Sequence, residues 1–461
     1  MYRIAAKDHS GKTLMEALRT LGAPVSAPCG GNGTCGKCRV WADGKEVLAC
    51  RTVVDRDMTV ELPVNESVVL KDFAAVSADG ACDYALAYDI GTTTVVCYLI
   101  DGKTGEISDS LGCENPQRAF GADVISRIQY VMDTGSSELK NRLEQTMREL
   151  AWKIASDKEI SMVSVVGNTA MHHLLLGIDP KPLTVPPYMP QSLDAVEQEG
   201  LRILPNIAGF VGGDTVGCML AAEFDKRQSL TLLLDIGTNG EMVLGNKIQR
   251  LACSTAAGPA FEGAKITCGM GGAKGAVDHV WIEDGRLRWS VIGGGAAKGL
   301  CGSGLLDLVA CLLELGIISE TGRMDCETFY LGDTGVYLTQ KDVREVQLAK
   351  GAIRAGIELM CSHRGVKPEQ IEEVLLAGAF GNYLAPKSAC KIGMIPPCLE
   401  EKIRPIGNAA GMGAAMCAAH KEAFETAKHL AAQTEFLELA SKADFQDLFV
   451  DCLSFEENED V

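Results

Sequence analysis

ALAYDIGTTTVVCYLID, at residues 85–101, is the stretch that decides the fold, because its pattern returns as TLLLDIGTNGEMVLGN at residues 231–246. Each copy is an apolar run, then Asp-Ile-Gly-Thr, then a polar turn, then a second apolar run. Each copy therefore predicts a strand, a tight turn and another strand. Such a repeat within one chain indicates two lobes of similar structure in an α/β body.

The two repeated turns are candidate phosphate-binding loops, since a turn with exposed N–H and hydroxyl donors can cradle phosphate oxygens. The aspartates that end the first strands, Asp89 and Asp235, can hold Mg²⁺ directly or through water. One such turn is weak evidence and two in matching context are strong evidence, although two ordinary hairpins remain the alternative. The candidate loop residues are Gly91, Thr92, Thr93 and Thr94, and Gly237, Thr238 and Asn239.

Two other nucleotide-binding motifs fit poorly. A P-loop is excluded because the chain contains no G-x4-G-K-[ST] sequence. A dinucleotide Rossmann site is poorly supported, because the glycine clusters follow strand–turn–strand units and not strand–turn–helix units.

A second constellation begins at residue 29 with CGGNGTCGKC. With a fourth cysteine in LACRT, the spacing is C-x5-C-x2-C-x11-C, and four thiolates complete the ligation of a 2Fe–2S cluster. The loop glycines let the backbone wrap tightly and direct N–H groups at the sulfides. Zinc is the alternative, but zinc sites usually show two short cysteine pairs and only one exists here. The predicted ligands are Cys29, Cys35, Cys38 and Cys50.

The residues around these cysteines predict a small β-grasp ferredoxin domain at residues 1–65. Residues 2–6 alternate like a strand, residues 13–21 have helical spacing, and Asp43-Gly44 is a hairpin signal between two short strands. Residues 66–83 are predicted to be a linker, which could reach roughly 60 Å if fully extended.

Composition narrows the functional classes. The net charge of −18 opposes binding to nucleic acid and to acidic membrane surfaces. No stretch offers the 18 or more apolar residues of a membrane span, and the start of the chain has no signal-peptide pattern. We therefore expect a cytoplasmic location, where most of the 18 cysteines stay reduced.

The body is predicted to comprise lobe I at residues 84–225 and lobe II at residues 226–461, the latter with the C-terminal helices. Helices are expected at residues 136–156, 304–316 and 341–362, a strand at 373–378, and an Ala-rich helical tail at 407–441.

This organisation resembles the actin, sugar kinase and heat-shock chaperone ATPase fold, which has five characteristic segments in a fixed order. Residues 89–94 and 235–241 resemble its two phosphate segments. Residues 167–171 and 407–414 resemble its connect segments, whose small residues would let two helices cross closely. The resemblance implies ATP binding, with an adenosine segment that includes Gly378, Ala379, Phe380, Gly381 and Asn382.

A ferredoxin loop joined to this ATPase fold resembles the reductive activators of corrinoid proteins. The resemblance is carried by CGGNGTCGKC, YDIGTTT, VVGNTAMHHLLLG, LDIGTNGE, CSTAAGPAFEGAKITCGM and LLAGAFGN, and it spans residues 29–415. Larger members have a long linker and a middle domain between cluster and ATPase. Because only residues 66–83 separate them here, a short form lacking the middle domain is expected.

The resemblance implies an ATP-dependent, one-electron reduction of Co(II) to Co(I) in a corrinoid (cobalamin-binding) protein of a methyltransferase system. The cofactors would be a 2Fe–2S cluster, ATP and Mg²⁺. The electron would pass through the cluster from a low-potential donor, and a homodimer is compatible with the family.

Three acidic residues are candidates for catalysis. Asp235 would act with Asp214, in GGDT, which could position Mg²⁺ or the attacking water, while Glu262, in GPAFEG, could line the nucleotide pocket. A plain turn residue is the alternative for Asp214. His172 and His173 are expected in the core or at an interface and not as metal ligands, and CGSG at 301–304 is expected to enter a helix.

Three other functions remain open at this point. The first is an ATP-driven donor to another enzyme, such as a dehydratase activator, although these usually hold a 4Fe–4S cluster and lack a ferredoxin domain. The second is a nucleotide-binding redox sensor. The third is a sugar or acid kinase with an added cluster, for which no carbon-substrate pocket is recognisable.

Overall fold

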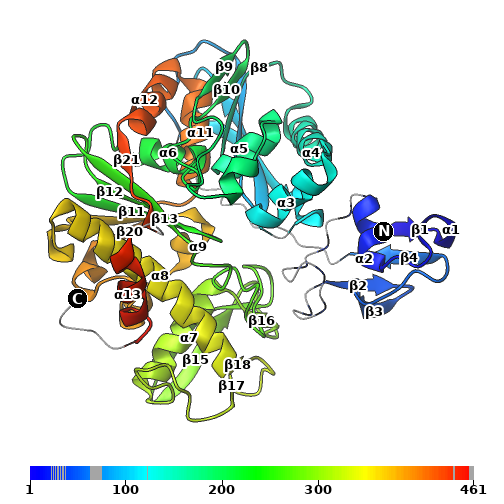
Figure 1. The fold of residues 1–461 in the computed structure, drawn as a ribbon, viewed down its shortest axis with the longest axis vertical. Helices are drawn as coiled ribbons and strands as arrows, with labels where there is room; N and C mark the ends of the chain where they lie inside the picture. Colours follow the sequence, from blue (N-terminus) through cyan, green and yellow to red (C-terminus); the bar gives the residue numbers. More distant parts are fainter. Residues whose placement is uncertain are drawn as a thin grey trace.

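The computed structural model describes residues 1–21, 23, 25, 27, 31, 33, 36, 38–62, 75–121, 123–439 and 442–455. Two of the predicted cluster ligands, Cys29 and Cys35, and the first half of the predicted linker lie outside the described residues. Figure 1 shows a small N-terminal unit and a larger body that contains the two predicted lobes.

The N-terminal unit has its own core beneath a four-stranded sheet. The helix α2 (Leu14–Thr20) begins with a capping box, in which Thr13 and Glu16 satisfy each other's backbone N–H groups. Its Leu14, Ala17 and Leu18 are buried, as the helical spacing predicted, whereas Leu21 lies past the helix end and is exposed. The short α1 spans Ala6–His9, and the strands in sheet order are β1 (Tyr2–Ile4), β4 (Met58–Glu61), β2 (Arg39–Ala42) and β3 (Lys45–Leu48).

The hairpin β2–β3 turns at the predicted Asp43-Gly44. Both residues have positive φ angles, 48° and 76°, which are the angles that a two-residue type I′ turn requires. The turn therefore fixes the register, in which Ala42 pairs with Lys45 and Arg39 with Leu48.

The body contains two six-stranded sheets whose central strands share one order. In each sheet the strand that carries Asp-Ile-Gly-Thr pairs antiparallel with the next strand along the chain and parallel with a later one. The first sheet runs β7 (Ile107–Glu114), β6 (Thr94–Asp101), β5 (Tyr84–Ile90), β8 (Ile160–Gly167), β10 (Leu201–Ile203) and β9 (Val196–Gln198). The second runs β21 (Thr434–Phe436), β13 (Arg250–Thr255), β12 (Gly240–Gly245), β11 (Thr231–Ile236), β19 (Glu373–Ala377) and β20 (Ile403–Pro405).

The shared order confirms the predicted duplication. When five strands of each sheet are numbered along the chain, starting from β5 or β11, they lie side by side in the order third, second, first, fourth and fifth. The repeated motif stands at the end of the strand numbered first. Parallel neighbours bring the ends of β5 and β8 to one edge, and those of β11 and β19 to another. The motif-bearing turns therefore occupy equivalent positions in the two halves of the body.

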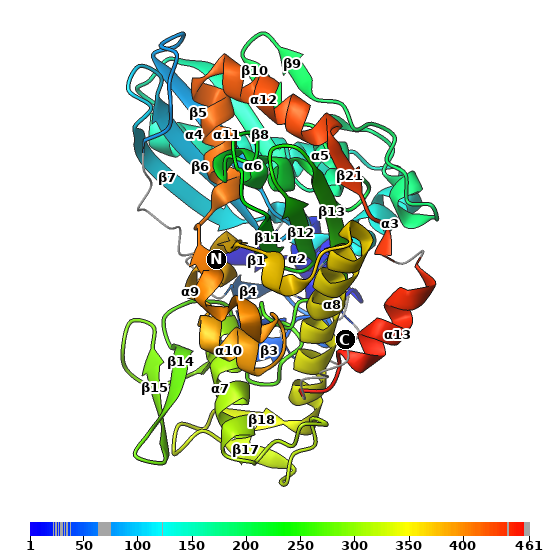
Figure 2. The same ribbon diagram turned by 90° about the vertical axis from the view of Figure 1, so that its left-hand side faces the viewer.

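One core joins the two sheets. Alternate residues of β5, such as Ala85 and Ala87, pack in the same cluster as Leu233 of β11 and the small residues of three helices. These helices are α6 (Gly213–Ala221), α11 (Ala409–Ala419) and α12 (Lys421–Ala432). The helix α11 packs on the first sheet although it follows most strands of the second sheet in sequence, and α12 packs against α6 and α11. Figure 2 shows α11 running from the middle of the body up to α12.

The opposite faces of the sheets have their own helical covers. The first sheet packs against α3 (Val124–Thr134), α4 (Glu138–Ala155) and α5 (Thr169–Leu176). The second packs against α7 (Gly302–Glu314) and α8 (Gln340–Arg364). The predicted helices at 136–156, 304–316 and 341–362 are thus present, whereas the single helical tail expected at 407–441 is two helices and the strand β21.

An insertion follows β13, built on β14 (Ala276–Glu283), β15 (Arg286–Val291), β16 (Gly299–Leu300), β17 (Thr328–Tyr330) and β18 (Tyr337–Thr339). Cys301 is the N-cap of α7, so CGSG enters a helix as expected. Two short helices, α9 (Gly378–Tyr383) and α10 (Pro386–Lys391), follow β19, and α13 (Ala443–Asp451) packs against α8 near the C-terminal end. Four 3-10 turns complete the body: η1 (Pro116–Ala119), η2 (Lys181–Thr184), η3 (Pro368–Gln370) and η4 (Pro397–Lys402).

The second half of the predicted linker is bound to the body. Val76 is buried, and its N–H donates to the carbonyl of Gly105 at 2.9 Å. Asp79 is hydrogen-bonded to the start of α12. Only residues 63–74 are left as a connection, which can span at most about 40 Å and not 60 Å.

Among the described residues, no helix combines the length and the apolar character that crossing a membrane would need.

Candidate nucleotide site and cluster loop

The two motif hairpins have nearly the same register. Ile90 pairs with Val95 in the first, and Ile236 pairs with Gly240 in the second, so the second turn is one residue shorter. As a result Asp89 lies opposite the apolar Val96, whereas Asp235 lies opposite Glu241. The second hairpin therefore carries an extra carboxylate that the first lacks.

The first turn is held by polar side chains from several elements. The Nδ2 of Asn168 donates to Thr92 Oγ1 at 3.0 Å, and the Nδ2 of Asn115 donates to the Gly91 carbonyl at 2.8 Å. Arg127, which is fully buried on α3, donates to the Thr92 carbonyl and to that of Gly121. These bonds fix the backbone of the turn before any ligand is present.

The two turns meet at one carboxylate. Glu262 accepts hydrogen bonds from Thr238 Oγ1 at 2.7 Å and from Thr93 Oγ1 at 3.2 Å. Since Thr93 belongs to the first hairpin and Thr238 to the second, Glu262 joins the two halves of the site. The structure thus brings Glu262 to the loops, as the sequence analysis suggested.

Four half-buried carboxyl groups are found at or next to the motif strands: Asp89, Asp214, Asp235 and Glu241. Burial raises the pKa of Asp89 to about 6, assisted by the charge of Asp235 and partly offset by a hydrogen bond from Asn408. Burial, followed by the charges of neighbouring acids, also raises the pKa of Asp214 and of Glu241. For Asp235 burial alone raises the pKa, against a weak bond from the Cys218 thiol. Such a group of acids favours a bound cation.

Asp214 is in the first turn of α6, whose N-cap is Gly212. Its Oδ1 accepts from the N–H of Thr215 at 2.8 Å. Burial, followed by the charges of Asp235 and Asp89, raises the pKa of Asp214. Asp214 is therefore a residue of the first helical turn, and its role in positioning an ion or a water stays a prediction.

The predicted adenosine segment lies beside the second hairpin. Gly378 has φ +81°, and a Cβ added there would lie 2.7 Å from Asp235 Oδ1, so a side chain would displace that carboxylate. The ring of Phe380 stacks on Phe261 with centroids 5.2 Å apart, next to Glu262. Ala379, Gly381 and Asn382 follow in the same short helix, α9.

No complete metal site is preformed in the described part of the chain: no three His, Cys, Asp or Glu side chains there are placed to hold a metal ion. Mg²⁺ usually takes one or two carboxylates and completes its shell with waters and phosphate oxygens. The donor set around Asp89 and Asp235 therefore fits a Mg²⁺ ion that arrives with a nucleotide.

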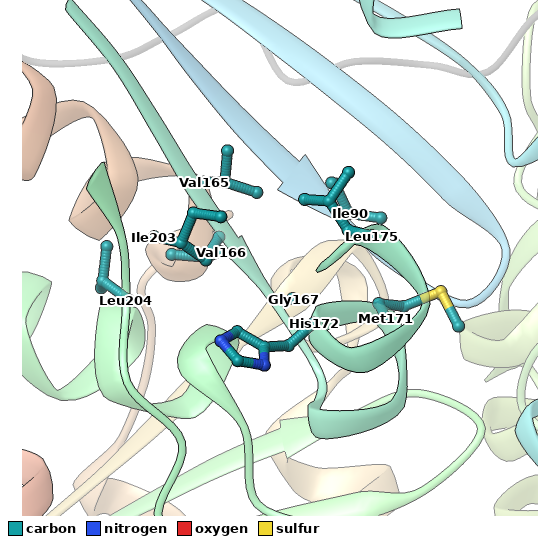
Figure 3. Close-up of a pocket in the computed structure, with 9 residues that line it drawn as sticks. All are labelled: Ile90, Val165, Val166, Gly167, Met171, His172, Leu175, Ile203 and Leu204. Carbon is teal, nitrogen blue, oxygen red and sulfur yellow. The ribbon is translucent and has the colours of Figure 1, made fainter. Parts of the chain in front are cut away.

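A small cavity of about 10 Å³ lies between β5, β8 and α5, and Figure 3 shows His172 at its side. It has room for about one water and none for a nucleotide. His172 and His173 are both buried, and His173 bonds the carbonyl of Thr169 and the N–H of Gln191 with its two ring nitrogens. Both histidines are thus core residues, as expected.

The cluster loop is described only in part. The Sγ atoms of Cys38 and Cys50 lie 3.2 Å apart, which is too long for a disulfide at about 2.05 Å and suits two ligands of one metal centre. Gly31, Gly33 and Gly36 have φ angles of 96°, 74° and 66°, a region that only glycine adopts freely. The predicted tight wrapping is therefore present at these glycines. The placement of Cys29 and Cys35 lies outside the described residues.

The prediction of the helix-crossing segments needs a correction. Residues 167–171 end β8 and begin α5, and they are not the partner of α11. The crossing is made by α6, because the backbones of Gly217 and Gly413 are in contact and a Cβ on Gly413 would overlap Gly217. The sequence GGDTVG at residues 212–217, whose glycines lie at or near the start of α6, is the local signal that could have indicated this crossing.

Several site residues were not predicted. Asn408 had been assigned only to a connect segment, but its Nδ2 donates to Asp89 Oδ2 at 2.8 Å. Glu241 had no role assigned, and Arg127 and Asn115 carried no motif. Only Asn168 and Asn408, each a polar residue beside small ones, offered a local signal.

Comparisons with known proteins agree along the chain. Residues 229–460 match the C-terminal domain of RACo, the ASKHA domain; residues 84–227 match the RACo middle region; residues 3–59 match the 2Fe-2S iron-sulfur cluster binding domain. The solved structure of a reductive activator for corrinoid,iron-sulfur protein has 30% identity and a TM-score of 0.72, covering 96% of this chain and 95% of that one. The predicted fold class, a ferredoxin domain before a two-lobed ASKHA fold, is thereby confirmed.

Two curated relatives are also similar. Corrinoid activation enzyme RamQ of Eubacterium limosum is 35% identical over 81% of this chain and 71% of its own length. The [Co(II) methylated amine-specific corrinoid protein] reductase of Methanosarcina barkeri is 26% identical over 70% of this chain and 68% of its own length.

The match to the middle region corrects one expectation. The sequence analysis expected a short form that lacks a middle domain, because so few residues separate the cluster from the ATPase. Residues 84–227 are that middle region, and in the structure they form the first sheet with its helices. The expectation of a short form was therefore wrong.

Proposed function

Because the chain belongs to the RACo family, as its sequence resemblance predicted, we propose that it is an ATP-dependent reductive activator that returns the cobalt of a corrinoid protein from Co(II) to Co(I). The single observation that carries this proposal is that a 2Fe-2S cluster-binding domain is joined to a body with two Asp-Ile-Gly-Thr hairpins.

The N-terminal domain would hold the cluster through Cys29, Cys35, Cys38 and Cys50. When bound, a cluster of this kind supplies one electron at a potential near −400 mV. The chain's own contribution is the loop: its left-handed glycines allow backbone N–H groups to face the sulfurs, and Cys38 and Cys50 already place two thiols together. The donor that refills the cluster would be a low-potential one.

The body would supply free energy that the cluster lacks. Co(I) is a stronger reductant than such a cluster, so the transfer is uphill, and for one electron each 59 mV corresponds to about a tenfold change in equilibrium. A ligand shifts an equilibrium only by its differential affinity for the two states. Nucleotide must therefore bind one arrangement of the two lobes more tightly than the other.

The residues that would bind nucleotide surround the acidic group. The turn residues Gly91–Thr94 and Gly237–Asn239 would donate N–H and hydroxyl groups to phosphate oxygens. Asp89 and Asp235 would take Mg²⁺, whose charge would relieve their mutual repulsion, and Asp214 would orient a water. Glu262 would release Thr93 and Thr238 to the phosphates, since these hydroxyls otherwise bond its carboxylate.

The partner is proposed to be a corrinoid protein of a methyltransferase system. A dehydratase activator is disfavoured, because such activators lack the ferredoxin domain that residues 3–59 match. The homodimer and the cytoplasmic location stay predictions, which mass photometry and cell fractionation would check.

Two variants test the proposal, one in the cluster-binding domain and one in the nucleotide site. Cys38→Ala should abolish the visible absorption of the cluster and the reduction of Co(II), yet leave ATP affinity within about twofold, because the cluster domain has its own core. Asp235→Ala should weaken Mg-ATP binding by about 100-fold through the loss of a charged ligand, and leave the cluster spectrum unchanged. The exposed residues Cys326 and Asp333 provide matched controls as alanine variants. Loss of ATP binding in Cys38→Ala, or of the cluster in Asp235→Ala, would contradict the proposal.

A further inference from the structure

The segment 75–83, which we call the tether, links the cluster domain to a particular helix of the body. Its start is fixed by the bond from the Val76 N–H to Gly105, in the turn between β6 and β7. Gly105 has φ +75°, and a Cβ there would overlap the Val76 carbonyl, so the two backbones are in close contact. The tether is therefore part of the body and follows its movements.

Asp79 fastens the tether to the C-terminal end of α11. Its N–H donates to the carbonyl of Ala419 at 3.1 Å, and its Oδ2 accepts from the N–H of Lys421 at 2.9 Å. Its Oδ1 also accepts from Ala81 N–H within the tether at 2.9 Å. Partial burial acts to raise the pKa of Asp79, but the N–H donors of Lys421 and Ala81 outweigh it, so the pKa lies below its ordinary value. Asp79 is thus a charged acceptor at physiological pH.

The N-terminal end of α11 is fastened to the candidate nucleotide site. Asn408 caps the helix by accepting from the N–H of Gly411 at 3.0 Å. Its Nδ2 donates to Asp89 Oδ2 and to the hydroxyl of Tyr98, both at 2.8 Å. The same carboxylate that would face Mg²⁺ therefore holds the start of α11.

One uninterrupted helix joins these two ends. With 11 residues it is about 16 Å long, at 1.5 Å per residue. It lies against α6 through the backbone contact of Gly217 and Gly413, and its buried alanines pack in the same core as α6 and β5. Figure 2 shows it running from the middle of the body up to α12. Because the backbone hydrogen bonds of the helix connect its turns, a displacement at Asn408 can be passed along α11 to Ala419.

We propose that the binding of nucleotide and its cation at Asp89 is transmitted by α11, through Asp79, to the tether. The tether in turn sets where the connection to the cluster domain begins. This inference rests on the proposed nucleotide site. Cation and Asn408 amide bind the same carboxylate, so nucleotide loading changes the bond that anchors α11. Asp79 carries the change to residues 75–83, from which residues 63–74 lead to the cluster domain.

Hydrogen–deuterium exchange of the full-length protein tests the proposal, with and without Mg²⁺ and a non-hydrolysable ATP analogue. In the unmodified chain, nucleotide should change exchange by about fivefold or more in peptides that cover 75–83 and 417–422, since single backbone bonds of this kind are at stake. Nucleotide affinity is measured on the same samples by calorimetry, and cluster content by absorption.

Asp79→Ala should make exchange at 75–83 fast in both states and remove its response to nucleotide, with nucleotide affinity and cluster absorption kept within about twofold. ATP-driven corrinoid reduction should fall by about tenfold while ATP hydrolysis persists, because nucleotide no longer positions the tether. Asp83→Ala is the matched control, because Asp83 is also an acidic residue of the tether. The variant removes an exposed ion pair with Lys103 and should behave like the unmodified chain.

The outcomes separate the two proposals. If nucleotide binds but the tether does not respond, or if Asp79→Ala responds as the unmodified chain does, the role of α11 is overturned and the proposed function stands. If the unmodified chain binds no nucleotide, both proposals are overturned.

Discussion

The two motif hairpins share a sequence and a fold but differ in what surrounds them. Around the first, Arg127, Asn168 and Asn115 bond the turn, and Asn408 bonds the aspartate. Around the second, Asp235 has a weak contact with Cys218 Sγ at 3.7 Å and lies opposite another carboxylate. The first hairpin therefore has several donors to its turn and its aspartate, while the aspartate of the second has one weak donor and an acidic neighbour.

This difference teaches that duplication of a strand–turn–strand unit does not duplicate its role. In the first hairpin the backbone of the turn is held by several donors, and its aspartate is bonded to the start of α11. In the second hairpin, neighbouring carboxyl groups raise the pKa of Asp214 and of Glu241, and a bound cation would offset the repulsion among them. The following variants test this division.

The largest effect is expected for Arg127→Met, which removes the buried guanidinium behind the first turn. The variant should lower the free energy of unfolding by roughly 3 kcal/mol, because the carbonyls of Thr92 and Gly121 lose their donor inside the core. Thermal unfolding followed by circular dichroism measures it. Arg148→Met, at a side chain that is 73% exposed, is the control. Equal stability of the two variants would show that the first hairpin is not held by Arg127.

The next comparison removes the partner of each aspartate. Asn408→Ala should cost about 2 kcal/mol of stability, since it deletes the cap of α11 and the donor to Asp89 and Tyr98. Cys218→Ala should cost about 1 kcal/mol, mainly through lost packing of a small buried group. Chemical denaturation measures both. Similar losses, or a larger loss for Cys218→Ala, would abolish the distinction between the hairpins.

The binding of Mg-ATP should depend on pH through Asp89, whose pKa is raised to about 6. Above pH 6 the carboxylate is charged and can take the cation; as the pH falls through 6, a proton must first be displaced. Affinity should therefore fall by about tenfold for each pH unit below 6. Calorimetry between pH 5 and 8 gives the profile, and Asp89→Asn should make its slope below pH 6 shallower while lowering affinity throughout. A flat profile in the unmodified chain would exclude Asp89 as the ion's ligand.

The smallest effect is expected for Gly378→Ala beside the second hairpin. The left-handed backbone should cost about 1 kcal/mol of stability, as it should for Gly365→Ala, where a Cβ would meet nothing within 4 Å. Only Gly378→Ala should also weaken nucleotide binding, by several-fold, because its Cβ would press on Asp235. Equal nucleotide affinities for the two variants would mean that Asp235 can shift freely.

The sequence predicted what is local. Both hairpins, the hairpin at Asp43-Gly44 and the buried face of α2 follow from short stretches whose residue types allow few other conformations. The family resemblance extended this to the ferredoxin and ASKHA folds. Domain limits and the catalytic assignments of Asp214, Asp235 and Glu262 remain predictions.

The contacts that complete the site could not be predicted because they join distant parts of the chain. Asn408 and Asp89 are 319 residues apart, and nothing near Asn408 specifies its partner. Glu241 faces Asp235 only because the second turn is one residue shorter, which the repeat did not show. The crossing of α6 and α11 was assigned to residues 167–171, since small residues occur in both places and only packing distinguishes them.

The most direct measurement mixes the protein with a corrinoid protein held as Co(II), under anaerobic conditions with a chemical reductant, and follows Co(I) by its visible absorption. Co(I) should form when Mg-ATP is present and the cluster is intact, and should not form without nucleotide, with Cys38→Ala or with Asp235→Ala. Formation of Co(I) at the same rate without nucleotide would contradict the coupling between cluster and body.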